Sequence, residues 1–272
     1  MKIRAIILSA LILCGISAVI MYSRAAQPLQ KSSVITQAIN DKNTPMVIKN
    51  LILKMKEQME VNDDQFPELI KEVENYTNSC ADSASVAVLH SMLAEMYQNY
   101  FQRNQWTINQ RTQLSGYIPE DIRVWTSNLF TDKIKEEIDL SLRPTALLQN
   151  TPVSKFKDIL EIGKDSQTLR PTLYEFLAFR ALDIQPTVQI YKDLIAFQNK
   201  EPNMKSVLLT ELDYLRFLYG DKRDKESFEA YMNALDELYR NLASQNYAAE
   251  ILIAKLDLVS GSMFRYVSTP VS

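Results

Sequence analysis

The stretch TLRPTLYEFLAFRALD, residues 168–183, shows within a few residues how this chain folds. Its Arg170-Pro171 step ends any preceding helix, because the residue before a proline is disfavoured in the α region. Thr172 and Glu175 have the spacing of a capping box, in which each side chain accepts the backbone amide hydrogen of the other residue. The pattern then predicts a helix with one buried apolar face, made of Leu173, Phe176, Leu177 and Leu182.

Similar start and stop signals recur on both sides of this stretch. Helix starts are predicted at Thr44-Pro45, Asp82 or Ser83, Thr151-Pro152, Asn203 and Asp224. Helix ends are predicted at Gly163, Gly220 and Gly261. Two further helices are expected over residues 119–129 and 132–142, the first opened by a proline and two acidic residues.

These helices cannot each bury an apolar face alone, so they must pack on one another. Short connections favour antiparallel neighbours, and five glycines leave few residues for the turns of a β fold. We expect an all-α fold of stacked antiparallel helical hairpins, a degenerate tetratricopeptide-like array without a strict repeat. The expected order is a tether or a frayed first helix over residues 27–43, the helical stack over 44–261 and an irregular tail over 262–272.

Residues 1–26 have the pattern of an export signal, in which basic residues precede an apolar run. Small residues at Ser23 and Ala25 favour cleavage after Ala25. Two alternatives stay open, because the apolar run is also long enough to anchor the chain in a membrane and Cys14 is a site for lipidation. All three place the body in the periplasm or cell envelope, with membrane contact only through residues 1–26.

The charge balance argues against nucleic acid as a partner. The formal net charge is −3, and basic clusters are lacking, whereas affinity for nucleic acid depends on Lys and Arg contacts to phosphates. A glycine-rich phosphate loop is also lacking. We expect no nucleic-acid partner and no cofactor.

Residue types that carry catalytic or metal chemistry are sparse. His90 is the only histidine, and metal sites and Ser-His-Asp arrangements need several such groups together, so a surface or hydrogen-bonded structural role is expected. Cys80, the cysteine outside the leader, is expected to be a small buried residue. Three acidic pairs are expected to be solvated beside lysines such as Lys133: Asp63-Asp64, Glu72 with Glu74, and Glu136-Glu137. We expect no enzyme activity and no metal site.

Aromatic residues are the one group of residues that suggests a recognition surface, and several of them lie within residues 97–106. At helical spacing most of them are explained by the core. Trp106 lies beside polar residues at a helix junction, where an indole N–H can reach a polar edge. Tyr100 and Trp106 are therefore the candidate contacts for a partner.

Several segments, taken in order over roughly residues 85–185, resemble the N-terminal helical region of very large bacterial α2-macroglobulin-like proteins. They are YQNYFQRNQWTINQR (97–111), Asp121-Ile122 with Trp125 and Phe130, IDLSL (138–142) and RPTLYEFLAFRALD (170–183). The thioester motif of that family, a cysteine followed by Glu-Gln, is not found at Cys80. Its β-sandwich domains do not follow within these residues.

The resemblance implies an exported, non-catalytic interaction or scaffold module, similar to the front end of a protease-trap envelope protein without its thioester and bait region. The partner it implies is a protein, either downstream domains or an envelope partner. A helical glycan-capture protein of the outer-membrane starch-binding type is the alternative. Two tryptophans in the whole chain, and Leu13 before Cys14 in place of a small residue, argue against that alternative.

Overall fold

The computed structural model describes residues 35–36, 38–39, 43–61, 65–112, 118–160, 165–200, 203–220, 222 and 224–267. Within these ranges the chain is helical, and the one strand-like feature is an isolated bridge between Pro152 and Thr172. The predicted all-α class is therefore confirmed. The chain divides into two compact units, Met1–Gln185 and Pro186–Ser272, which are described in turn.

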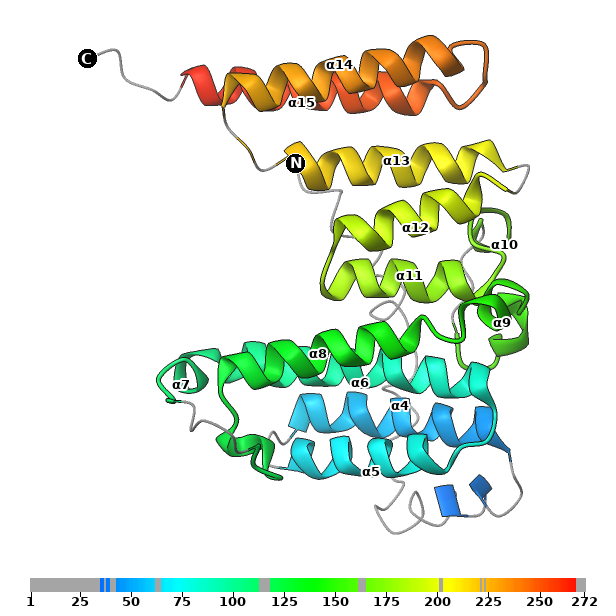
Figure 1. Ribbon diagram of the computed structural model, residues 1–272, viewed down its shortest axis with the longest axis vertical. Helices are drawn as coiled ribbons and strands as arrows, with labels where there is room; N and C mark the ends of the chain where they lie inside the picture. The colour runs from blue at the N-terminus through cyan, green and yellow to red at the C-terminus, as the bar shows by residue number, and fades with distance from the viewer. Residues whose placement is uncertain are drawn as a thin grey trace. The chain divides into compact units, whose positions relative to one another are not determined.

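The first unit contains most of the helices of the described chain (Figure 1). They are α4 (Thr44–Val61), α5 (Phe66–Ser79), α6 (Ser83–Arg103), α7 (Gln105–Ile108), η2 (Ile122–Val124), α8 (Ser127–Ser141), α9 (Thr145–Gln149), η3 (Val153–Phe156), α10 (Ser166–Leu169) and α11 (Leu173–Ile184).

Helix α6 is the centre of this unit, because α4, α5, α8 and α11 all pack against it. Side-chain pairs give the directions. Phe130 near the start of α8 lies against Tyr100 near the end of α6, while Glu137 further along α8 meets His90, so α6 and α8 are antiparallel (Figure 1). Helix α11 instead runs parallel to α6, since Arg180 bonds to Ser91 and, further along both helices, Gln98 donates to the Ile184 carbonyl. The unit therefore contains a parallel neighbour as well as antiparallel ones.

The capping box that opens α11 is formed as predicted. The Thr172 hydroxyl accepts from the Glu175 amide at 3.3 Å, and the Glu175 carboxylate accepts from the Thr172 amide at 3.1 Å. Leu173, Leu177 and Leu182 are buried, as expected.

The prediction that Phe176 is buried is wrong. Its side chain is half-buried, and the Arg180 guanidinium lies 6.0 Å from its ring centroid. Tyr174 and Phe179 are buried instead, so the apolar face of α11 is broader than the sequence spacing indicated. A helix packed on more than one side buries residues outside a single stripe.

We expect Thr172→Ala to lower the free energy of unfolding by about 0.5–2 kcal/mol, because it removes the hydroxyl that caps α11. Chemical denaturation of the variant measures this cost. Thr172→Ser keeps a capping oxygen and is the matched control, expected to lose much less. Equal losses for both variants would show that the threonine methyl group, and not the cap, is responsible.

Other predicted helix ends are confirmed or corrected by the caps. The predicted caps Asp82, Asn203 and Asp224 accept hydrogen bonds from the backbone amides of Ser85, Ser206 and Ser227 respectively, and α13 ends at Gly220. Helix α4 is capped one residue earlier than predicted, because Asn43 Oδ1 accepts from the Met46 amide at 3.2 Å. Thr151-Pro152 opens only the short η3.

The helix predicted over residues 119–129 is also wrong. Residues 119–126 contain only the short η2, and Trp125 and Thr126 are extended before α8 begins at Ser127. The Trp125 indole N–H donates to the Pro119 carbonyl at 2.6 Å, and Arg111 donates to the Trp125 carbonyl at 2.7 Å. These bonds hold Trp125 in an extended turn, where its ring enters the core.

The second unit consists of α12 (Val188–Gln198), α13 (Met204–Tyr219), α14 (Lys225–Leu242) and α15 (Ala249–Val267). Consecutive helices in this unit pack side by side and alternate in direction (Figure 1). Its core is built from α13, α14 and α15 and consists of Leu208, Leu212, Tyr231, Leu235, Ile251 and Ala254, with Leu215, Leu238 and Leu258 packed against them.

The predicted end of the last helix is wrong, because α15 continues through Gly261 to Val267. Residues 262–267 of the predicted irregular tail are thus helical. A glycine weakens a helix by about 1 kcal/mol, a cost that the other residues of a long helix can outweigh.

Some predictions fall largely or wholly outside the described residues. The leader over residues 1–26, Asp63-Asp64 and Gly163 are among them. In the segment predicted as a tether or a frayed first helix, residues 35–36 and 38–39 are helical, and Ile35 and Ala38 are buried, which fits a first helix better than a free tether. No described helix combines the length and the apolar character needed to cross a membrane.

Candidate functional site

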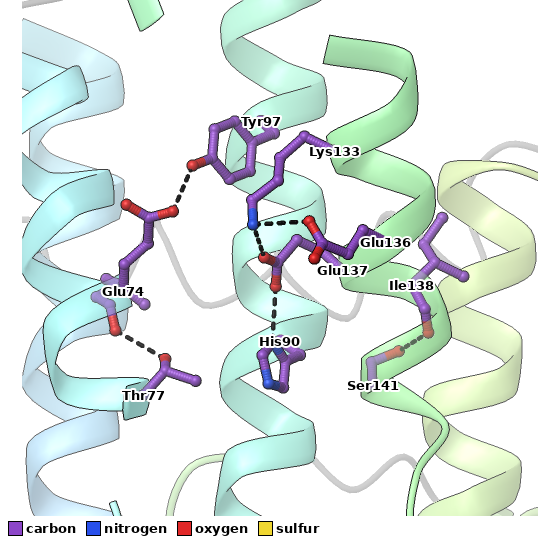
Figure 2. Close-up of polar contacts among 10 residues, drawn as sticks. Glu74, Thr77, His90, Tyr97, Lys133, Glu136, Glu137, Ile138 and Ser141 are labelled. Atoms are coloured by element: carbon purple, nitrogen blue, oxygen red, sulfur yellow. Dashed lines mark hydrogen bonds and ion pairs between the residues drawn. The ribbon is translucent and has the colours of Figure 1, made fainter. Parts of the chain in front are cut away.

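Charged residues that the sequence placed in water form a partly buried cluster between α6 and α8 (Figure 2). His90 Nδ1 lies 2.7 Å from Glu137 Oε2. Lys133 Nζ lies 2.9 Å from Glu137 Oε1 and donates to Glu136 Oε2 at 2.9 Å. Glu137 is only 2% exposed. The prediction that Glu136-Glu137 is a solvated pair is therefore wrong for Glu137.

The position of Glu137 on α8 explains its burial. Phe130, Ile134, Ile138 and Ser141 are buried on the same helix, and residue 137 is three positions after Ile134 and seven after Phe130. Residues at these spacings share one face of a helix. Helical spacing from Phe130 was thus a signal in the sequence that Glu137 enters the interface with α6.

Both charges at the centre of this cluster are stabilised by their partners. Burial raises the pKa of the Glu137 carboxyl, but hydrogen bonds from His90 and Lys133 outweigh it, so its pKa lies below the ordinary value. Burial lowers the pKa of the Lys133 ammonium, but its bonds to Glu137 and Glu136 outweigh that effect and raise it. A buried ion pair keeps its charges only when such hydrogen bonds satisfy them.

A second pair of acidic residues is also engaged rather than simply solvated. The Tyr97 hydroxyl donates to Glu74 Oε1 at 2.7 Å (Figure 2), which joins α6 to α5. Burial and this neighbouring carboxylate raise the pKa of Tyr97. Glu72 forms an ion pair with Lys54 of α4. Glu72 and Glu74 are both half-buried and link one helix to another, so the prediction of solvated charge beside lysines holds only in part.

The His90–Glu137 pair has the form of a base held by a carboxylate, which is one half of a nucleophilic site. Nearby hydroxyls have other partners. Ser91 Oγ accepts from Arg180 at 2.9 Å, and the Ser141 hydroxyl donates to the Ile138 carbonyl at 2.7 Å. No set of three or more potential metal ligands occurs among the described residues. The geometry of the cluster supports helix packing, with His90 in a hydrogen-bonded structural role.

The predicted contact residues Tyr100 and Trp106 differ in their surroundings. Tyr100 is 7% exposed, and its ring centroid lies 5.7 Å from that of Phe130. The interpretation of Tyr100 as a surface contact is therefore corrected, because its ring is part of the core. Trp106, in α7, is 78% exposed.

The aromatic rings around Phe130 form one cluster at this end of α6. Four of them have centroids within 6.5 Å of its ring: Tyr97, Tyr100, Phe101 and Trp125. Since Trp125 is buried, Trp106 is the one exposed tryptophan of the two in the sequence.

Cys80 follows the end of α5 and is half-buried. Its thiol lies 3.9 Å from the Asp82 carbonyl oxygen, a weak S–H donor contact. This position agrees only in part with the expected small buried residue, since part of the side chain is accessible.

An exposed apolar surface on α15 was missed at the level of sequence. Leu252, Ile253, Leu256 and Val259 are all exposed there. The sequence predicts an end of this helix at Gly261 but does not show which of its apolar positions are buried. Its two apolar faces become distinct only when the packing of one of them against α13 and α14 is known.

Comparison with protein-family models, with curated proteins and with solved structures gives no match to this chain.

Proposed function

We propose that this chain is an exported, non-catalytic helical module that binds another protein. Its histidine and its central buried carboxylate are engaged in helix packing, as His90 and Glu137 illustrate. The side chains that remain available to a partner are those on the surface of the helices. The resemblance to the front end of α2-macroglobulin-like envelope proteins supports the same proposal, with downstream domains or an envelope protein as the partner.

The observation that carries the proposal is the exposure of Trp106. Leaving a whole indole in water is unfavourable, because burying a large apolar side chain contributes about 1.5–3 kcal/mol. Tryptophan is also enriched among the residues that dominate protein interfaces. Polar neighbours such as Gln105 and Gln110 are exposed beside it and would form the rim of such a contact.

The architecture that we propose for this module is a degenerate tetratricopeptide-like array. The consecutive antiparallel pairs α5 with α6, α12 with α13 and α14 with α15 support it. Capture of glycans is less well supported. Sugar rings stack on exposed aromatic faces, and the burial of Trp125 leaves Trp106 alone among the tryptophans.

Export is part of the proposal, carried by the leader pattern of residues 1–26. We propose cleavage after Ala25, with retention as an anchor or lipidation of Cys14 as the alternative fates. The mass of the chain purified from the producing cells distinguishes the three. A full-length chain recovered from the cytosol would contradict export.

The experiment places a photo-cross-linking amino acid at position 106 in cells that export the chain. We expect a discrete protein adduct, which mass spectrometry identifies. The control carries the same amino acid at Lys135, an exposed charged position on α8. That variant is expected to give no adduct of the same mass.

The purified partner is then titrated with the wild-type chain and with Trp106→Ala. We expect affinity to fall by about 30-fold, the effect of losing 2 kcal/mol at a central interface residue. The variant should keep its helical circular-dichroism spectrum, because the side chain makes little contact with the core. Unchanged affinity would reject Trp106 as the contact.

A further inference from the structure

The connection between α6 and α8 carries the most exposed large apolar side chains of the first unit. Trp106 in α7 is 78% exposed, Ile118 is 70% exposed and Val124 in η2 is 54% exposed. The other exposed apolar side chains described in this unit reach at most 46%. Apolar residues scattered singly over a surface are ordinary, whereas several gathered in one segment indicate a binding surface.

The described parts of this connection are fixed to the core and do not extend freely into solvent. Ile108 at the end of α7, Ile122 at the start of η2 and Trp125 just after it are all buried. A binding surface that is already held in place loses less conformational entropy when a partner binds. The exposed side chains of the connection therefore form a surface that is ready to bind.

Two hydrogen bonds bring exposed residues of the connection near one another. The Arg111 guanidinium donates to the Trp125 carbonyl at 2.7 Å, and the Trp125 indole N–H donates to the Pro119 carbonyl at 2.6 Å. Ile118 precedes Pro119 in the chain, and Val124 precedes Trp125. Ile118 and Val124 are therefore close to each other, and Arg111 lies beside them.

The charges along this connection differ from those of the whole chain. The formal net charge is −3, yet no aspartate or glutamate occurs between Glu95 and Glu120. Glu95 is paired with Arg180 at 2.6 Å, and Asp121, next to Glu120, is paired with Arg123 at 3.3 Å. The segment that contains α7 therefore supplies no carboxylate of its own.

Arg111 differs from the arginines that are paired within this chain. Arg123, Arg180 and Arg216 each form an ion pair with a carboxylate. The half-buried Arg111 has no such pair within the described residues, and its guanidinium donates to the Trp125 carbonyl. A guanidinium has five N–H donors, so Arg111 keeps donors for a carboxylate supplied from outside the chain.

We propose that this connection binds an acidic segment of the protein partner, whose apolar side chains pack on Trp106, Ile118 and Val124 and whose carboxylate pairs with Arg111. The inference rests on the proposed function, which places the partner at Trp106, and adds the chemistry of the segment that binds there. An arginine holds a carboxylate through two parallel hydrogen bonds. Aromatic residues and arginine are also enriched in the parts of protein interfaces that bind most strongly.

The first experiment places the photo-cross-linking amino acid at Ile118 or at Val124 in cells that export the chain. Both variants are expected to give an adduct with the same protein that position 106 captures. Leu147 on α9 is the matched control, because it is also an exposed apolar residue, and it should give no such adduct. An adduct at position 106 with none at 118 and 124 would overturn this inference and leave the proposed function standing. Lipid adducts at 118 and 124 in place of protein would overturn it as well.

The second experiment titrates the captured partner, once identified and purified, with variants of Arg111. Arg111→Gln is expected to weaken binding by about tenfold, because it removes the charge that meets the carboxylate. Arg111→Lys keeps that charge and should weaken binding by no more than about threefold. Lys135→Gln removes an exposed cation of α8 that pairs with Asp139, and it should leave the affinity unchanged. Equal losses for Arg111→Gln and Arg111→Lys would overturn the role of the charge.

The salt dependence of binding separates the charge contribution from apolar packing. Raising sodium chloride from about 0.05 M to about 0.5 M shortens the range over which charges attract each other. The affinity of the wild type should therefore fall more steeply with salt than the affinity of Arg111→Gln. Parallel salt dependence of the two chains would contradict a carboxylate at Arg111. Both chains should have the same helical circular-dichroism spectrum, because Arg111→Gln removes a single hydrogen bond of the fold.

The proposed function and this inference fail in different ways. Absence of a protein adduct at positions 106, 118 and 124 alike would reject the proposed function together with the inference. A partner captured at position 106 whose affinity responds neither to Arg111→Gln nor to salt would reject only the inference.

Discussion

Replacing Phe130 by alanine is expected to lower the free energy of unfolding of the first unit by about 3–5 kcal/mol. The Phe130 side chain is fully buried, and Tyr97, Tyr100, Phe101 and Trp125 surround its ring. Removing it leaves a cavity between helices α6 and α8, and the rigid rings around it cannot all move in to fill that space.

Tryptophan fluorescence is a direct measurement of this effect, because both tryptophans lie within the first unit. A Trp106→Phe background leaves Trp125, whose ring centroid is 5.3 Å from that of Phe130, as the only reporter. Urea denaturation then gives the loss of stability. Phe176→Ala is the matched control, since the half-buried Phe176 should lose under about 2 kcal/mol. Similar losses at both positions would contradict the core assignment of Phe130.

Replacing Glu137 by alanine is expected to cost about 3–5 kcal/mol, the effect of breaking a buried ion pair by removing one partner. The Lys133 ammonium would keep only the exposed Glu136, and His90 would lose its carboxylate partner. The large part of the cost is the burial of polar groups whose hydrogen bonds are no longer made.

Helix α8 contains a matched control for this substitution. Lys135 and Asp139 form an ion pair at 2.8 Å with the same four-residue spacing, but both side chains are largely exposed. Asp139→Ala should cost far less than Glu137→Ala, because solvent screens an exposed pair. Equal costs would show that burial does not strengthen the pair at Glu137.

The same pair predicts how stability depends on pH. The pKa of Glu137 lies below its ordinary value of 4.5 in the folded chain, so in this range the unfolded state binds more protons than the folded state. The contribution of the Glu137 carboxylate to the free energy of unfolding is present at pH values above its ordinary pKa. That contribution is lost as the pH falls through the pKa of Glu137 in the folded chain. The stability difference between the wild type and Glu137→Gln should therefore shrink as the pH is lowered below about 4.5. A difference that stays constant with pH would contradict the assignment.

Local signals in the sequence predicted the helices well where the cap and its target are close in the chain. The Thr172–Glu175 box and the Asp82, Asn203 and Asp224 caps each join residues three positions apart. Their hydrogen bonds form within one turn of helix and depend little on the rest of the fold. The all-α class followed from these signals together with helical apolar spacing.

The sequence failed where a distant contact overrides the local pattern. The proline and acidic residues at 119–121 resemble a helix start, yet Trp125 is drawn into the core and the helix begins only at Ser127. Gly261 resembles a helix end, yet α15 continues through it. In both places local propensity contributes less than the contacts that tertiary packing provides.

By itself, the sequence determined the helical class, the positions of most caps and the scarcity of catalytic residue types. Only the tertiary structure decided that His90 meets Glu137 across 47 residues, that Tyr100 lies in the core while Trp106 is exposed, and that one face of α15 is left open. The physical reason is that caps and helical periodicity act between residues within a turn or two of each other. Burial and ion pairing depend instead on which helices pack together, and that is settled by the sum of contacts between residues far apart in the chain.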